Sequence, residues 1–234
     1  MKVVLFCGGA GTRLREASQR LPKPLTPVGN QPLLWHLMRY YEHFGHNEFI
    51  LCAGYGAEHI KDFLRDSPNR RVSLVDTGEQ ASIGERLRSI AGLVDGDEMF
   101  LANYSDGLTD LALPEYIDEF STTDAVGSFL AVHPSQSFHS VVVDDDGTVT
   151  AFRSAHDSDL WINGGFFVFR KEIFDYVYEG EDLVDAPFQR LIAERRLLGQ
   201  KYDGFWACLD TYKDKLNFDA LNRQGLTPWM VWKS

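Results

Sequence analysis

Strands and helices alternate through the first third of the chain, and this alternation constrains the fold more than any other feature. Residues 3–7 are continuously apolar and are followed by glycines, which is typical of a strand buried on both faces of a parallel sheet. A helix at 32–41, a strand at 48–53, a helix at 57–64 and a strand at 71–75 follow. This order predicts a parallel sheet with right-handed crossovers, whose ligands bind beyond the carboxyl ends of the strands.

The remaining sequence continues the pattern and adds a β-rich region. An acidic turn at 144–147 ends in glycine, which suits a tight hairpin reversal and is more typical of an exposed turn than of a metal site. The other predicted elements are strands at 98–104, 124–132 and 161–169, hairpin strands at 141–143 and 148–152, helices at 114–120, 171–178 and 185–196, and a last helix from 210.

A glycine loop follows the first strand. Gly8, Gly9 and Gly11 leave the backbone free of side chains, so that N–H groups can converge on an anion. Arg13 and Lys23 add positive charge nearby, a combination that suits a nucleoside triphosphate. A plain tight turn after the strand remains open as an alternative on spacing alone.

Two better-known phosphate loops do not fit this sequence. The dinucleotide fingerprint requires a third glycine where Leu14 stands, and an acidic residue about twenty positions on, where Gln31 and Pro32 stand. The P-loop ends in Gly-Lys-Ser/Thr, a tripeptide that does not occur in the chain. Rossmann dinucleotide binding and the common NTPase architecture are therefore disfavoured.

Composition limits the possible partners and compartment. The 234 residues are 44% hydrophobic, enough for a substantial core, and the net charge of -11 argues against a general nucleic-acid or anionic-membrane binder. Three widely spaced cysteines, Cys7, Cys52 and Cys208, make a disulfide framework or zinc site unexpected. No apolar run has the length of a signal-peptide core or a membrane span, so we expect a soluble, cytoplasmic protein.

Two aspartates and a second glycine loop are further candidates for the site. Asp106 lies just past the strand at 98–104, where it could hold Mg²⁺, although an Asp-Gly pair is usually only a turn. Asp210 opens the last helix, and its local sequence favours an N-cap. The loop at 77–87 leads into a helix and is a candidate contact for a base or ribose.

Several motifs in order resemble the sugar-phosphate nucleotidyltransferases, and the later ones resemble glucose-1-phosphate cytidylyltransferases in particular. The similarity covers nearly the whole chain. The motifs are the loop Gly8-Gly9-Ala10-Gly11-Thr12-Arg13-Leu14, Pro22-Lys23-Pro24-Leu25, Pro32-Leu33-Leu34-Trp35-His36, Leu74-Val75-Asp76-Thr77-Gly78, Ser105-Asp106-Gly107, Ile162-Asn163-Gly164-Gly165-Phe166-Phe167, Gly204-Phe205-Trp206, Asp210-Thr211 and Pro228-Trp229.

The resemblance implies one nucleotidyltransferase domain over 1–234. Its fold would be a three-layer, Rossmann-like α/β architecture with a mixed, mainly parallel sheet and a small β-rich extension on the acceptor side. The implied reaction is an in-line attack by a phosphate oxygen on the α-phosphorus of CTP, with release of pyrophosphate, and it depends on charge neutralisation and alignment.

The resemblance also implies roles for individual residues. The triphosphate would be held by Thr12, with Arg13 on the leaving pyrophosphate and Lys23 near the reacting phosphates. Asp106 and Asp210 would bind Mg²⁺, reversing their readings as turn and N-cap. The nucleotide would be lined by Gly8, Gly9, Ala10 and Gly11, helped by Arg86 of the second loop, and Asn163 would contact the acceptor.

The residues at the positions expected to bind the acceptor depart from the family pattern. The Glu-Lys-Pro motif, whose lysine binds the acceptor phosphate, is replaced by 152–157, where Arg153 or His156 could substitute. His139 stands where the family has a glycine beside the sugar. A family insertion used in subunit contacts is shortened at 66–70, so a homo-oligomer is possible without a defined state. The acceptor is therefore expected to be a small phosphorylated or phosphonylated compound, with glucose 1-phosphate as the default.

Two alternatives remain. The same chemistry could use UTP or dTTP, because base contacts made by the backbone are not fixed by sequence. The chain could instead be a catalytically silent nucleotide-binding module that regulates a partner, although the presence of both Asp106 and Asp210 with Arg13 and Lys23 argues against silence.

Overall fold

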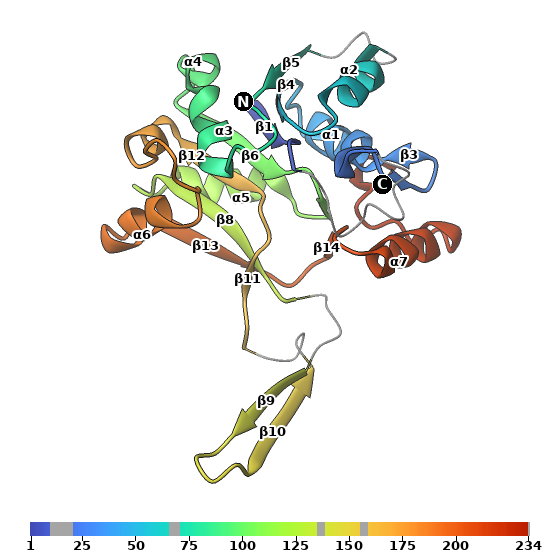
Figure 1. The fold of residues 1–234 in the computed structure, drawn as a ribbon, viewed down its shortest axis with the longest axis vertical. Helices are drawn as coiled ribbons and strands as arrows, with labels where there is room; N and C mark the ends of the chain where they lie inside the picture. Colours follow the sequence, from blue (N-terminus) through green and yellow to red (C-terminus); the bar gives the residue numbers. More distant parts are fainter. Residues whose placement is uncertain (10–20, 66–70, 135–138, 155–158, 234) are drawn as a thin grey trace.

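A mixed eight-stranded sheet forms the centre of the computed structural model, which describes residues 1–9, 21–65, 71–134, 139–154 and 159–233 (Figure 1). The strand order is β11-β8-β12-β6-β1-β4-β5, and β13 pairs with β8. Their bounds are β1 Lys2–Phe6, β4 Glu48–Ala53, β5 Arg71–Asp76, β6 Met99–Tyr104, β8 Gly127–Val132, β11 Ile162–Asn163, β12 Phe167–Arg170 and β13 Leu197–Tyr202.

The first half of the sheet is parallel, as the alternating pattern predicts. Strand β1 lies between β4 and β6, with Lys2 opposite Glu48 and Phe6 opposite Cys52, and β5 continues the sheet from β4. Strand β12 runs antiparallel to both β6 and β8, while β13 is parallel to β8. The predicted mixed α/β sheet is therefore confirmed.

Helices cover both faces of the sheet and make three layers. Alternate β1 residues enter two apolar clusters: Val3 and Leu5 pack with helices α1, α5 and α7, and Val4 and Phe6 pack with α3, α4 and α6. The helices are α1 Leu33–His43, α2 Ala57–Arg65, α3 Ile83–Ser89, α4 Ala91–Val94, α5 Leu113–Ser121, α6 Ala186–Ala193 and α7 Tyr212–Arg223, with 3-10 turns η2 Lys23–Leu25, η3 Lys171–Asp175 and η4 Val231–Lys233.

In the described part of the chain, three small two-stranded sheets accompany the central one. Strand β7 (Gly107–Thr109) pairs with β14 (Trp206–Cys208), and β2 (Pro27–Val28) pairs with β3 (Gln31–Pro32). The predicted hairpin is formed by β9 (His139–Val143) and β10 (Val149–Ser154), which project away from the body in Figure 1.

The long strand predicted at 161–169 is wrong in one respect, because it is broken into β11 and β12. Gly165 and Phe166 have φ values of +76° and +50°, which turn the backbone out of the extended conformation. Asn103 on β6 stabilises this turn, since its Oδ1 accepts a hydrogen bond from the Phe166 N–H at 2.9 Å. A contact from a distant strand therefore interrupts an otherwise good strand sequence.

The C-terminal third departs from the predicted elements at several further points and contains two strands, β13 and β14, that were not predicted. The predicted helix at 171–178 is only the 3-10 turn η3, and that at 185–196 ends at Ala193, where Arg195 at φ +57° redirects the chain into β13. Thr211, rather than Asp210, is the N-cap of α7. Within the described ranges, each helix is too short or too polar to cross a bilayer, and the three cysteines are buried and free.

A buried histidine should make folding stability depend on pH. His36 Nε2 donates to the Val28 carbonyl at 2.9 Å, and its Nδ1 accepts a hydrogen bond from Trp229 Nε1 at 3.4 Å. A ring that donates through one nitrogen and accepts through the other is neutral. Burial lowers the pKa of His36 below 6.5. Below about pH 6.5 the histidine of the unfolded chain takes up a proton more readily than that of the folded chain. The free energy of unfolding should therefore decrease as the pH is lowered below this value. Urea unfolding at pH 7.5 and 5.5 measures this loss.

The contribution of this histidine can be separated from that of other groups with a glutamine variant. His36→Gln keeps an N–H donor but cannot be protonated, so its stability should vary less between the two pH values than that of the native chain. His59→Gln, an exposed change on α2, is the control and should keep the native pH dependence. An equal pH dependence for all three proteins would contradict the role of His36.

Candidate active site

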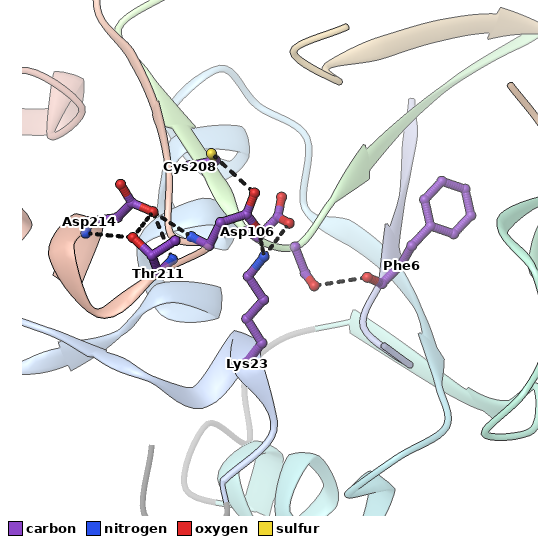
Figure 2. Close-up of polar contacts among 8 residues, drawn as sticks. Phe6, Lys23, Asp106, Cys208, Thr211 and Asp214 are labelled. Atoms are coloured by element: carbon purple, nitrogen blue, oxygen red, sulfur yellow. Dashed lines mark hydrogen bonds and ion pairs between the residues drawn. The ribbon is translucent and has the colours of Figure 1, made fainter. Parts of the chain in front are cut away.

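Three charged side chains meet at the carboxyl end of the sheet. Lys23 on η2 donates to Asp106 Oδ2 at 2.7 Å and also to Asp210 Oδ1 (Figure 2). Asp106 follows β6 and Asp210 follows β14, and the two backbones are joined where Leu209 N–H donates to the Asp106 carbonyl at 2.8 Å. The pairing of Gly107 with Cys208 therefore brings both carboxylates to one ammonium group.

The electrostatics of the cluster keep Lys23 charged. Burial lowers the pKa of Lys23, but Asp106 and then Asp210 raise it by charge and hydrogen bonding, and the net pKa lies above its ordinary value. Burial, followed by the negative charges of Asp210 and Asp106, raises the pKa of Cys208 to about 12. Cys208 is therefore a thiol, and its Sγ donates weakly to Asp210 Oδ2 at 3.7 Å.

The start of α7 fixes the position of Asp210. Asp214 Oδ2 accepts hydrogen bonds from the Asp210 N–H at 3.1 Å and the Thr211 N–H at 2.7 Å, and Thr211 and Asp214 form a capping box (Figure 2). On the other side, Ser105 Oγ donates to the Phe6 carbonyl at 2.8 Å, which ties the end of β6 to the end of β1.

A cavity of about 330 Å³ opens beside this cluster. Its volume lies at the lower end of the range for small-molecule sites. Its walls come from the ends of β1 and β6, from η2 and from the start of α3, so that it lies beyond the carboxyl ends of parallel strands as predicted. It is lined by Phe6, Cys7, Gly9, Lys23, Pro24, Ile83, Tyr104, Ser105, Asp106 and Asp210.

Arg86 holds together the ends of three neighbouring strands. Its side chain is 2% exposed, and its guanidinium donates to the carbonyls of Gly8 (3.2 Å), Ala53 (3.0 Å) and Glu79 (3.4 Å), and to Thr77 Oγ1. These acceptors follow or end β1, β4 and β5. The guanidinium therefore points at backbone rather than into the cavity, whose walls do not include it.

The close approach of Arg86 explains why residue 8 is a glycine. A Cβ atom at Gly8 would lie 1.9 Å from Arg86 Nη1, a separation that real structures do not show. Gly9 differs, because a Cβ there would meet no atom of the described residues within 4 Å, and Gly9 lines the cavity. Of these two predicted nucleotide contacts, Gly8 packs on the supporting guanidinium and Gly9 lines the cavity.

Asn163 lies beside the cavity through its contact with Tyr104. Its Nδ2 donates to Tyr104 Oη at 3.2 Å, and its Oδ1 accepts from the Gly165 N–H at 2.9 Å. Trp206 Nε1 donates to the next carbonyl, that of Gly164, at 2.8 Å. The residue that follows β11 is thereby connected to β14, which leads to Asp210.

Two other predicted acceptor residues, His139 and Arg153, are not brought to this cluster. His139 and Arg153 lie on the projecting hairpin, where the His139 ring stacks on Phe152 with centroids 5.1 Å apart, and neither lines the cavity. Ala10, Gly11, Thr12, Arg13 and His156 lie outside the described residues.

Several residues of the site were not predicted from sequence. Tyr104 and Ile83 line the cavity, and Asp214 orients the backbone of Asp210. The pattern Thr211-x-x-Asp214 is a recognisable capping box, so its signal was present in the sequence. Tyr104 could have been inferred from its place at the last position of a strand that leads to Asp106.

The donor set of the cluster fits a magnesium ion. Mg²⁺ commonly binds one or two carboxylates and completes its octahedron with phosphate oxygens and water. Asp106 and Asp210 already converge on one cationic group, the Lys23 ammonium, and keep side-chain exposures of 29% and 33%. Among the described residues, no group of three or more histidine, cysteine or acidic side chains could hold a metal.

Comparison with known proteins decides the family. The family model described as "Nucleotidyl transferase" matches residues 2–211, which include β1, Lys23 and both aspartates. The chain belongs to the nucleotidyl transferase family. Membership of this enzyme family agrees with the predicted resemblance.

Relatives within the nucleotidyl transferase family match over the full length. The chain is 34% identical to a Bacillus subtilis protein assigned as a glucose-1-phosphate cytidylyltransferase, over 99% of this chain and 100% of that one. It is 32% identical to the glucose-1-phosphate cytidylyltransferase of Salmonella typhi, over 100% of both.

Solved structures share the fold. HddC from Yersinia pseudotuberculosis superimposes with a TM-score of 0.70 at 22% identity, over 94% of this chain and 98% of that one. A Bacillus anthracis chain assigned as a glucose-1-phosphate thymidylyltransferase gives a TM-score of 0.74 at 17% identity, over 95% of both. The nucleotidyl transferase fold predicted from sequence is thus confirmed.

Proposed function

We propose that this nucleotidyl transferase moves CMP from CTP to a sugar 1-phosphate, or to a related small phosphorylated or phosphonylated acceptor, in the presence of Mg²⁺. The observation that carries the proposal is the meeting of Lys23, Asp106 and Asp210 at the mouth of a cavity beyond the carboxyl ends of β1 and β6. Full-length relatives named as cytidylyltransferases support the choice of nucleotide and of a hexose 1-phosphate as first candidate.

The chemistry would need charge neutralisation more than proton transfer. An oxygen of the acceptor phosphate, already anionic, attacks the α-phosphorus of CTP, and the bond to the bridging oxygen breaks so that pyrophosphate leaves with the electron pair. Asp106 and Asp210 would hold Mg²⁺, which when bound neutralises phosphate charge. Lys23 would donate to phosphate oxygens, and Gly9 would let the nucleotide approach the backbone.

The acceptor side would be built around β11. Asn163 is held by Tyr104 and by the Gly165 N–H, so its amide is oriented at the edge of the cavity. The lysine of the family Glu-Lys-Pro motif is absent, and Arg153 stands on the hairpin instead. We therefore propose that acceptor preference differs from that of the relatives more than nucleotide preference does.

A pyrophosphate-release assay that crosses CTP, UTP, dTTP and GTP with a panel of acceptors tests this function. The panel contains hexose 1-phosphates, polyol phosphates, amino-acid phosphates and phosphonates. We expect turnover with CTP to exceed that with each other nucleotide at least about tenfold, a difference of roughly 1.4 kcal/mol in transition-state binding. Faster turnover with UTP or dTTP would overturn the choice of nucleotide, and tight CTP binding without turnover would favour a silent module.

A further inference from the structure

The Lys23 ammonium occupies the position between the two carboxylates that a metal ion would take. It donates to Asp106 Oδ2 at 2.7 Å and to Asp210 Oδ1, while its own side chain is only 15% exposed (Figure 2). Each carboxylate keeps about twice that exposure, which leaves room for further oxygen ligands on the cavity side.

The backbone at Lys23 is fixed, so a change of partner would involve the side chain alone. Pro22 and Pro24 flank the residue, Leu25 is buried, and the Leu25 and Thr26 N–H groups donate back to Pro22 and Lys23 at 2.8 and 3.0 Å. The four-carbon stem of a lysine can rotate its ammonium group without moving such a turn.

Charge decides which cation the pair can accept. One ammonium and two carboxylates sum to -1, and a divalent ion added alone would raise this to +1 with two cations in contact. A nucleoside triphosphate brings enough negative charge to take up the ammonium and the metal together. The carboxylate pair can therefore bind a divalent metal well only after the Lys23 ammonium has another anion, such as a phosphate, to bind.

We propose that Lys23 keeps the Asp106 and Asp210 pair closed to divalent metal until a polyphosphate draws its ammonium away. The inference rests on the proposed function of the same site and adds an order to it, in which metal enters with the nucleotide or after it. Lys23 then has two partners in sequence: the carboxylates in the empty enzyme, and phosphate oxygens in the loaded one.

Binding of Mn²⁺ alone, followed by electron paramagnetic resonance, tests the inference without reference to activity. Lys23→Met removes the competing charge, so its affinity for Mn²⁺ should exceed that of the native protein at least about tenfold, the scale on which neighbouring groups change metal affinity. Lys23→Arg keeps the charge and should bind Mn²⁺ as weakly as the native protein. Asp106→Asn combined with Lys23→Met should lose the gain.

Controls separate failure of this inference from failure of the proposed function. Lys61→Met, an exposed lysine on α2, should leave Mn²⁺ affinity unchanged, and circular dichroism checks that each variant is folded. Native protein that binds Mn²⁺ alone as tightly as Lys23→Met would overturn the closed pair while leaving the metal site in place. Absence of Mn²⁺ binding in both, even with a non-hydrolysable CTP analogue, would overturn the metal site and the inference together.

Discussion

Replacing Asp106 or Asp210 with asparagine is expected to lower turnover at least about 1000-fold, because either change removes an anionic ligand from a site that contributes several kcal/mol to the transition state. Each asparagine keeps the size of the side chain, so the fold should persist. Pyrophosphate release at saturating CTP and Mg²⁺ measures the loss, and thermal unfolding checks the fold.

A second ion pair supplies the matched control for the aspartate variants. Asp97 pairs with Lys2 at 2.8 Å with similar partial exposure, but far along the sheet from the cavity. Asp97→Asn should therefore retain native turnover. Near-native rates in either Asp106→Asn or Asp210→Asn would remove the assigned metal role.

Replacing Arg86 with methionine is expected to lower both stability and nucleotide affinity. The buried carbonyls of Gly8 and Ala53 and the partly buried oxygens of Thr77 and Glu79, at the ends of β1, β4 and β5, would each lose the hydrogen bond from the guanidinium. Since a hydrogen bond to a charged group contributes about 1.5–3 kcal/mol and two of these bonds are buried, the free energy of unfolding should fall by roughly 3 kcal/mol. Urea unfolding measures this loss, and a CTP binding titration measures the accompanying weakening.

The pattern of losses distinguishes a positioning role from direct contact. Arg88, on the same helix, makes a hydrogen bond to the Val177 carbonyl at 2.7 Å, so Arg88→Met should cost less stability and leave CTP affinity unchanged. If Arg86 touched the nucleotide directly, Arg86→Met would lose CTP affinity while stability stayed near the native value. That result would contradict the positioning role.

The parallel half of the fold was predictable because its signals are local. Buried strands and amphipathic helices can each be recognised from the hydrophobic pattern of a few consecutive residues, and the predicted strand at 48–53 matches β4. Errors arose where a distant residue decides the conformation. Asn103 breaks the strand at Phe166, and nothing in the sequence near Arg195 requires the left-handed conformation that ends the preceding helical run.

The candidate site was predictable to the extent that its residues follow strands. Asp106 was placed correctly because Asp-Gly follows a buried strand at the ligand edge of the sheet. The N-cap reading of Asp210 was wrong, since the adjacent Thr211 caps the helix. Arg86 was predicted to lie in the loop at 77–87 but lies on α3, and its partners come from three separate strand ends that no local pattern could reveal.

The short β7–β14 ladder makes the site modular. Asp106 precedes one strand and Asp210 follows the other, so their spacing is determined by three backbone pairs rather than by the path of the chain between them. Residues 110–205 leave this ladder and return to it, and they include the projecting hairpin. The hairpin can therefore change in length or sequence while the two carboxylates keep their separation.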